Sequence, residues 1–168
     1  VLRGGDGNDK ITYSYYSSNT IEGGSGDDQI LSGNQSANPG TAYTNTFTGG
    51  LGNDRFLSGV GADTYIFGRG DGQDSISDYG AVGAVTDKIV FGAGIVKGDL
   101  VLSRSGANLV IKVNDPNNAA ATDQITIENW DTAVFRIEQV QFADGTVLTV
   151  SDLNSMAMTG SDGADAMT

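Results

Sequence analysis

A nine-residue repeat constrains the fold of this chain more than any other feature of its sequence. Full copies of the pattern Gly-Gly-x-Gly-x-Asp-x-apolar-x occupy residues 4–12, 23–31 and 49–57, and looser copies follow at 58–66 and 69–77. The glycines permit a tight turn because glycine adopts positive φ without steric cost. The last three residues place one apolar side chain between two outward ones, as in a short strand. One such unit cannot bury its apolar face alone, so the pattern predicts stacked turns and strands.

The spacing of the aspartates predicts how the turns stack. Asp9 and Asp28 are separated by about two repeats, with a degenerate copy around Asn19 between them. A second degenerate copy contains Asn45, and the segment from Ser32 to Thr44 absorbs the extra residues. If successive turns lie on alternate edges, one edge, here called the aspartate edge, carries Asp9, Asp28, Asp54 and Asp74. The opposite edge, here called the asparagine edge, carries Asn19, Asn45 and Asp63.

The composition favours a cation, and not nucleic acid, as the ligand. The chain has 18 Asp against 3 Glu and a net charge of −12. Aspartate suits turns because it hydrogen-bonds its own backbone, and the acidity argues against binding phosphates. Cys and His are absent, so the usual zinc and copper ligands are missing and a hard cation held by oxygen remains. No apolar run approaches the roughly 18 residues of a membrane span.

The repeat resembles the calcium-binding nonapeptide of the repeats-in-toxin (RTX) family. The resemblance implies an all-β fold: a right-handed parallel β-roll, which is a calcium-binding nonapeptide solenoid. In that family calcium sits between stacked turns, bound by backbone carbonyls and aspartate carboxylates. We expect about three strong calcium positions on the aspartate edge, and one or two weaker ones at most on the asparagine edge. The expected ligand residues are Gly4, Asp6, Asp9, Gly23, Gly24, Gly26, Asp28, Gly49, Gly50, Gly52, Asp54, Asp63, Gly70, Gly72 and Asp74.

Some acidic residues have a plainer interpretation. Isolated Asp-Gly hairpin turns would explain single pairs, but not the phased aspartates and apolar positions of the repeat. Asp63 is equally compatible with a ligand and with a turn residue, because the turn that contains Asn45 offers no glycines. Five other aspartates are expected to be solvated turn residues: Asp27, Asp78, Asp87, Asp123 and Asp144.

After Asp78 the repeats stop and longer strand-like runs begin. Strands are expected at 88–91, 100–102, 109–113, 124–127, 137–142 and 147–150. From about Asp87 to Leu153 the chain resembles the haemolysin-type calcium-binding-related domain that follows RTX repeats, through Asp-x-Ile-x-Phe, Ile-x-Asn-Trp and Phe-Ala-Asp-Gly-Thr. We expect this β-rich region to cap the open end of the roll. Its expected apolar plugs are Trp130, Phe135 and Phe142.

These patterns predict three regions: a calcium-binding roll at 1–80, a capping domain at 81–158, and the start of a further repeat at 159–168. We expect the parent chain to continue in both directions. No nucleophile elbow, zinc-protease motif or credible triad is present, so we expect no enzymatic activity in this chain.

The RTX resemblance implies calcium-triggered folding of a large toxin or adhesin that leaves the cell by type I secretion. The expected location is extracellular, including the cell surface. The expected partners are calcium ions, the type I secretion machinery through the parent chain, and a host or cell-surface ligand. Two alternatives stay open: an adhesive ligand-binding module, and the non-catalytic tail of a secreted hydrolase or epimerase.

Overall fold

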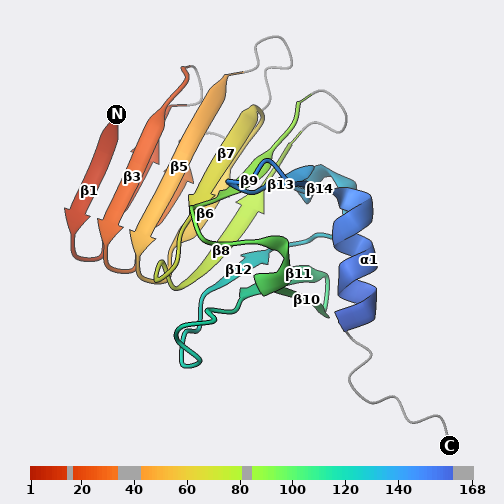
Figure 1. Cartoon of the computed structure of the whole chain (residues 1–168). Coiled ribbons are helices and arrows are strands. Elements are labelled where there is room, and N and C mark those ends of the chain that lie inside the picture. Colours follow the sequence, from red (N-terminus) through yellow and green to blue (C-terminus); the bar gives the residue numbers. More distant parts are fainter. Residues whose placement is uncertain (15–16, 34–42, 81–84, 161–168) are drawn as a thin grey trace, which may run out of the picture.

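The computed structural model describes residues 1–14, 17–33, 43–80 and 85–160, and these residues form two seven-stranded sheets (Figure 1). Sheet 1 comprises, in spatial order, β1 (Leu2–Asp6), β3 (Thr20–Ser25), β5 (Thr44–Leu51), β7 (Ala62–Phe67), β9 (Lys88–Phe91), β13 (Gln139–Gln141) and β14 (Val147–Thr149). Sheet 2 comprises β2 (Lys10–Tyr13), β4 (Gln29–Ser32), β6 (Arg55–Ser58), β8 (Gln73–Asp78), β12 (Gln124–Ile127), β11 (Asn108–Val113) and β10 (Leu100–Ser105). Three helical elements complete the fold: η1 (Lys97–Asp99), η2 (Ala133–Phe135) and α1 (Val150–Gly160).

The repeats form the predicted parallel β-roll. Consecutive strands alternate between the two sheets, so each strand pairs in parallel with the strand two places along the chain. The apolar position of each repeat is in register with the same position of the next repeat on its sheet. In sheet 2 this column is Ile11, Ile30, Phe56 and Ile76. In sheet 1 it is Ile21, Phe47, Tyr65 and Ile89.

Aromatic rings fill the middle of the roll. Phe47 stacks on Tyr65 with ring centroids 5.1 Å apart and lies 5.4 Å from Tyr13 and 5.9 Å from Phe56. All four rings are buried. Buried aromatic side chains contribute large apolar areas, so this cluster gives a glycine-rich stack a core that the short strands alone would lack.

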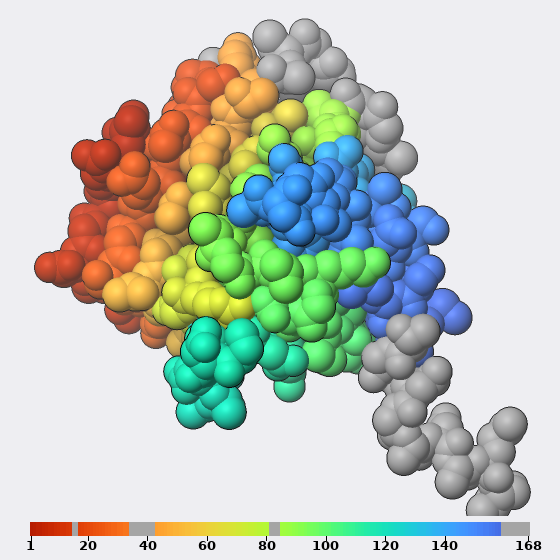
Figure 2. All heavy atoms as spheres, in the orientation of Figure 1, coloured from red at the N-terminus to blue at the C-terminus, as the bar shows by residue number. Residues whose placement is uncertain are grey.

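Both sheets continue from the repeats into the C-terminal half. β9 pairs in parallel with β7, and β12 pairs in parallel with β8. Beyond them the pairing becomes antiparallel, in β10–β11–β12 and in β13–β14. The C-terminal segments cover the end of the stack opposite to β1 (Figure 2). Ile76 of β8 and Ile89 of β9 are buried in this arrangement.

Helix α1 is the main departure from an all-β chain. It contacts β10 and β14, and it begins at Val150, where the sequence pattern predicts the end of a strand. The reason is a local cap: the Thr149 amide and hydroxyl both donate to Asp152 Oδ2, at 2.8 and 2.6 Å. Ser/Thr followed three residues later by an acid favours a helix start. The expected strand at 137–142 is also shorter, limited to β13.

The proposed plugs divide into two buried residues and one at the surface of the cap. Trp130 and Phe142 are buried, and the Trp130 indole N–H donates to Asn154 Oδ1 on α1 at 2.8 Å. Phe135 is half-buried and contacts the Tyr79 ring at 5.5 Å. The expected new repeat at 159–168 lies outside the described residues beyond Gly160. Within the described part of the chain, no helix is long and apolar enough to cross a membrane.

Candidate metal centres

The aspartate edge carries a continuous ladder of carboxylates. The Asp9 amide donates to Asp28 Oδ1, the Asp28 amide to Asp54 Oδ1, and the Asp54 amide to Asp74 Oδ1, at 2.8, 2.8 and 2.9 Å. These four aspartates therefore lie on one edge, as their spacing predicts. The carboxylates of Asp28, Asp54 and Asp74 are each fixed in place by a backbone amide of the preceding turn.

The second carboxylate oxygen of the ladder is left without a partner. The Oδ2 atoms of Asp9, Asp28 and Asp54 are buried and accept no hydrogen bond within the described residues. Burying a carboxylate oxygen without a compensating interaction is costly. Three such oxygens in a row indicate that the edge is built around a ligand with positive charge.

The first glycine of each repeat makes room for that oxygen. A Cβ added to Gly4 would lie 2.7 Å from Asp9 Oδ2, and a Cβ added to Gly23 or Gly49 would overlap the Oδ2 atom of its own repeat. Any side chain at this position would push the carboxylate aside. Glycine is required here by close approach to the carboxylate.

The inner glycines of the repeats bring carbonyl oxygens close together. Gly24 and Gly50 have φ of +124° and +103°, and a Cβ on either would overlap the carbonyl oxygen of the preceding turn, from Gly5 and Gly24 respectively. A Cβ on Gly4 would lie 2.5 Å from the Gly23 carbonyl oxygen and 2.7 Å from Asp9 Oδ2, so backbone oxygens also lie close to the carboxylates. Carboxylate and carbonyl oxygens together are the ligands that calcium prefers.

An outer ladder, which sequence reasoning missed, ties the same turns together. The Asp27 amide donates to Asn8 Oδ1, the Asn53 amide to Asp27 Oδ1, and the Gln73 amide to Asn53 Oδ1, at 2.9, 2.7 and 2.9 Å. Asp27 is exposed as predicted, yet it has a structural partner. The available signal was Asn or Asp at the fifth position of every full repeat.

On the asparagine edge, side-chain amides make hydrogen bonds between neighbouring turns. The Asn19 amide N–H donates to Asn45 Oδ1 at 3.2 Å, and Asn45 Nδ2 donates to Asp63 Oδ1 at 2.8 Å. The Asp63 amide then donates to Asp87 Oδ1 at 2.8 Å. Asparagine both donates and accepts. Its side chain can therefore give an N–H to the neighbouring turn, which an aspartate carboxylate cannot do.

Three predicted solvated aspartates are in fact buried: Asp78, Asp87 and Asp123. The prediction was wrong because each lies where the two halves of the chain cover one another. The Asp87 amide donates to Glu138 Oε2, and Asp123 Oδ2 accepts the Gly70 amide, each at 2.8 Å. Asp78 Oδ2 accepts the Tyr65 hydroxyl at 2.9 Å. Asp27 and Asp144 are exposed, as expected.

Burial makes several of these carboxyl groups hard to ionise. It raises the pKa of Asp54 to about 6 and that of Asp74 to about 8. On the asparagine edge, burial raises the pKa of Asp63, Asp78 and Asp87 as well. A bound cation would favour the ionised form and oppose these shifts.

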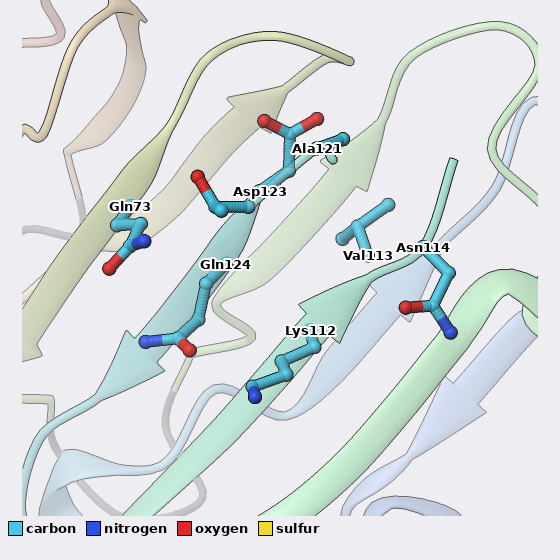
Figure 3. Close-up of a pocket in the computed structure, with 8 residues that line it drawn as sticks. Gln73, Lys112, Val113, Asn114, Ala121, Asp123 and Gln124 are labelled. Atoms are coloured by element: carbon cyan, nitrogen blue, oxygen red, sulfur yellow. The ribbon is translucent and has the colours of Figure 1, made fainter. Parts of the chain in front are cut away.

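Of the remaining predicted ligands, Gly26 and Gly52 lie in the middle turns, each against a carbonyl of the preceding turn, and the others lie at the two ends of the aspartate edge. Asp6 is exposed on the first turn, and Gly70 and Gly72 form the last turn against the cap. Beside that last turn is a pocket lined by β8, β11 and β12, with Gln73, Lys112 and Asp123 in its wall (Figure 3). The Lys112 ammonium group makes this pocket less suited to a cation than the carboxylate ladder, although Gln73 and Asp123 also contact the last turn.

Comparison with known proteins agrees with this geometry. Residues 1–13, 16–36 and 39–74 match the family described as RTX calcium-binding nonapeptide repeat (4 copies). Residues 108–152 match the haemolysin-type calcium binding protein related domain. The iron-regulated protein FrpA of Neisseria meningitidis serogroup C is 34% identical over 104 residues, which cover 62% of this chain and 9% of that protein.

A solved structure shows the same architecture. The extracellular lipase LipA from Serratia marcescens matches with a TM-score of 0.50 and 27% identity, over 73% of this chain and 17% of the lipase. This chain therefore spans a small part of both relatives. With the repeats, the roll and the C-terminal domain all matched, the chain belongs to the RTX calcium-binding nonapeptide-repeat proteins, with a haemolysin-type calcium-binding-related domain after the repeats.

Proposed function

We propose that this chain is a calcium-dependent folding module of a larger exported protein. The observation that carries the proposal is the row of buried, unpaired Oδ2 atoms of Asp9, Asp28 and Asp54. Calcium between the stacked turns would bind these oxygens together with backbone carbonyls of the glycine turns. The ladder has four aspartates and three intervals between them, so about three calcium ions are expected on the aspartate edge.

Calcium binding of this kind would couple folding to the location of the chain. Extracellular calcium modules bind with dissociation constants of roughly 10⁻⁴ to 10⁻³ M, far above the free calcium concentration inside a cell. Outside, each occupied site adds on the order of 1 kcal/mol, and stacked sites add together. The chain would stay unfolded during type I secretion and fold once it reaches the extracellular medium.

A second role, as the non-catalytic part of a secreted enzyme, is favoured by the likeness to the lipase LipA. The two roles are compatible, because a module that folds outside the cell can be attached to a catalytic domain. The ladders described above contain no histidine or cysteine, since the chain has none. We therefore assign the chain itself a structural role, in which calcium is a cofactor of folding.

Calcium titration of the purified chain tests the proposal. In chelator we expect little β-sheet circular dichroism, and in millimolar calcium we expect it to rise together with a shift in the emission of Trp130, the single tryptophan. Trp130 is buried in the cap, so its emission reports whether the cap folds with the roll. Magnesium at the same concentration is the control and should act weakly, because it demands smaller octahedral sites and retains its waters. A chain that stays fully folded after exhaustive chelation would overturn the proposal.

A further inference from the structure

Three carboxylates meet inside the roll at the C-terminal end of the asparagine edge. They come from three separate segments: Asp63 from β7, Asp78 from the end of β8, and Asp87 from the residues just before β9. One oxygen from each lies within 4.8 Å of the other two. All three residues are almost completely buried, with exposed fractions of 0, 1 and 1%.

Each of these carboxylates uses one oxygen for an internal hydrogen bond. Asp63 Oδ1 accepts from Asn45, Asp87 Oδ1 accepts the Asp63 amide, and Asp78 Oδ2 accepts the Tyr65 hydroxyl, which also contacts the Ser58 hydroxyl. The other oxygens of two of them, Asp63 Oδ2 and Asp78 Oδ1, are buried without a hydrogen-bond partner among the described residues. This is the same division between an anchored and a free oxygen that the aspartate edge shows.

Protein cations do not compensate this cluster. The ion pairs found in residues 1–14, 17–33, 43–80 and 85–160 join arginines to other acids, namely Glu22, Asp99, Asp115, Glu128 and Asp131. Uncompensated buried carboxylates are strongly unfavourable, and a protein resolves them by protonation or by binding a cation. Geometry can distinguish the two, because a cation needs several oxygens directed at one point.

The spacing of the oxygens suits calcium. Calcium binds oxygen at 2.3–2.6 Å, so two ligands on opposite sides of one ion are separated by up to about 5 Å. The three oxygens lie within 4.8 Å of one another, which is compatible with that range. Magnesium, at 2.0–2.1 Å with strict octahedral geometry and retained waters, fits a dry, enclosed cluster less well.

The cluster is not another copy of the repeat turn. Ser58 and Asp78 pair in register, and Ser58 precedes Asp63 by the same five residues that separate Gly49 from Asp54. Asp78 therefore occupies the place of the first glycine, where the repeat requires the absence of a side chain. Asp78 and Asp87 also lie outside both matched family ranges.

We propose that Asp63, Asp78 and Asp87 form an additional calcium site that joins the roll to the cap. The ligands come from both sheets and from the entry to β9, so one ion would fix the last repeat turn against the first strand beyond the repeats. The inference rests on the proposed function only in taking calcium as the ion. It replaces the expectation of a weak position at Asp63 by an enclosed site with three carboxylates.

Crystals of the whole chain grown in calcium provide the direct test. Anomalous scattering from calcium should show a peak within 2.3–2.6 Å of an oxygen from each of the three aspartates. Peaks along the aspartate edge without one at this cluster would overturn this inference and leave the proposed function intact. Crystals without any bound calcium would overturn both.

Calcium stoichiometry gives a second test that needs no crystal. Asp78→Asn keeps the size of the side chain and an acceptor for Tyr65, and it should lose one bound calcium per chain at saturation. Asp144→Asn, which makes the same charge change on an exposed cap loop, is the matched control and should retain the full number. A folded Asp78→Asn chain with unchanged stoichiometry would overturn the site. If Asp78→Asn fails to fold, Asp87→Asn and the crystallographic measurement decide.

Discussion

On both edges of the roll, the backbone amide of one turn donates to a side-chain oxygen of the next. The edges differ in whether that oxygen belongs to a carboxylate or to an amide. On the aspartate edge each turn ends in a carboxylate, which accepts an N–H with one oxygen and leaves the other unpaired. On the asparagine edge the first two turns end in amides, and Asn45 supplies the N–H that its neighbour Asp63 needs. The residue at the sixth position of the repeat therefore sets the need for a cation. An amide there can hydrogen-bond the next turn, whereas a carboxylate leaves one oxygen without a partner.

The largest difference between the edges should come from the first glycine of the repeat. Gly49→Ala places a methyl group on Asp54 Oδ2, whereas a methyl at Gly59, which follows Ser58 at the second position of its repeat, meets its nearest atom, Ser32 Oγ, at 3.7 Å. We expect Gly49→Ala to cost about 3 kcal/mol and Gly59→Ala to stay within about 0.5 kcal/mol. Urea unfolding at saturating calcium measures both. Equal costs would show that the carboxylate position is not what the glycine protects.

Removing one charge from the ladder should have the next largest effect. Asp54→Asn keeps the acceptor for the Asp28 amide but weakens the calcium positions on both sides of it. We expect the calcium midpoint of folding to rise about tenfold, equivalent to about 1.4 kcal/mol. The matched control is Asp27→Asn, an exposed neighbour that retains Oδ1 for the outer ladder. A midpoint shift as large in the control would point to net charge as the cause.

Converting the asparagine edge toward the aspartate edge should give a smaller change. Asn45→Asp removes the Nδ2 donor to Asp63 and places two carboxylates in adjacent turns. We expect a steeper calcium titration, because one more ion would bind on folding, with a midpoint change below about threefold. Titrations followed by circular dichroism report the slope. An unchanged slope would mean that the edge lacks the carbonyl ligands that the other edge provides.

The smallest effect should be a pH dependence without calcium. The folded-state pKa values of Asp54 and Asp74, about 6 and about 8, lie above the ordinary value near 4. Groups with raised pKa stabilise the fold fully below the unfolded pKa, and this contribution is lost as pH rises through 6 and 8. In chelator we therefore expect partial β-sheet circular dichroism near pH 4.5 that disappears above pH 8. Asp74→Asn should reduce this dependence, and identical spectra at both pH values would contradict it.

The repeat made the register of the roll predictable. Because the nine-residue pattern fixes both the turn and the inward residue, the alternation of Asp9, Asn19, Asp28 and Asn45 between edges followed from counting. Prediction failed where the partner is remote: Asp87 meets Glu138 and Gly70 meets Asp123, each more than 50 residues away. Nothing local marks such residues as buried. The start of helix α1 was missed for the opposite reason. The apolar alternation of 147–150 favoured a strand, although Thr149 and Asp152 form a local signal for a helix start.

The ladder of amide-to-carboxylate bonds has a direction, which gives the stack two unlike ends. Along the aspartate edge each amide donates toward the C-terminus, so Asp9 is the first donor and Asp28 the first acceptor, whereas the outer ladder donates toward the N-terminus. At the other end the outgoing N–H groups of Asp87 and Gly70 are received by Glu138 and Asp123 of the cap. The stack thus ends on acceptors that its own chain supplies.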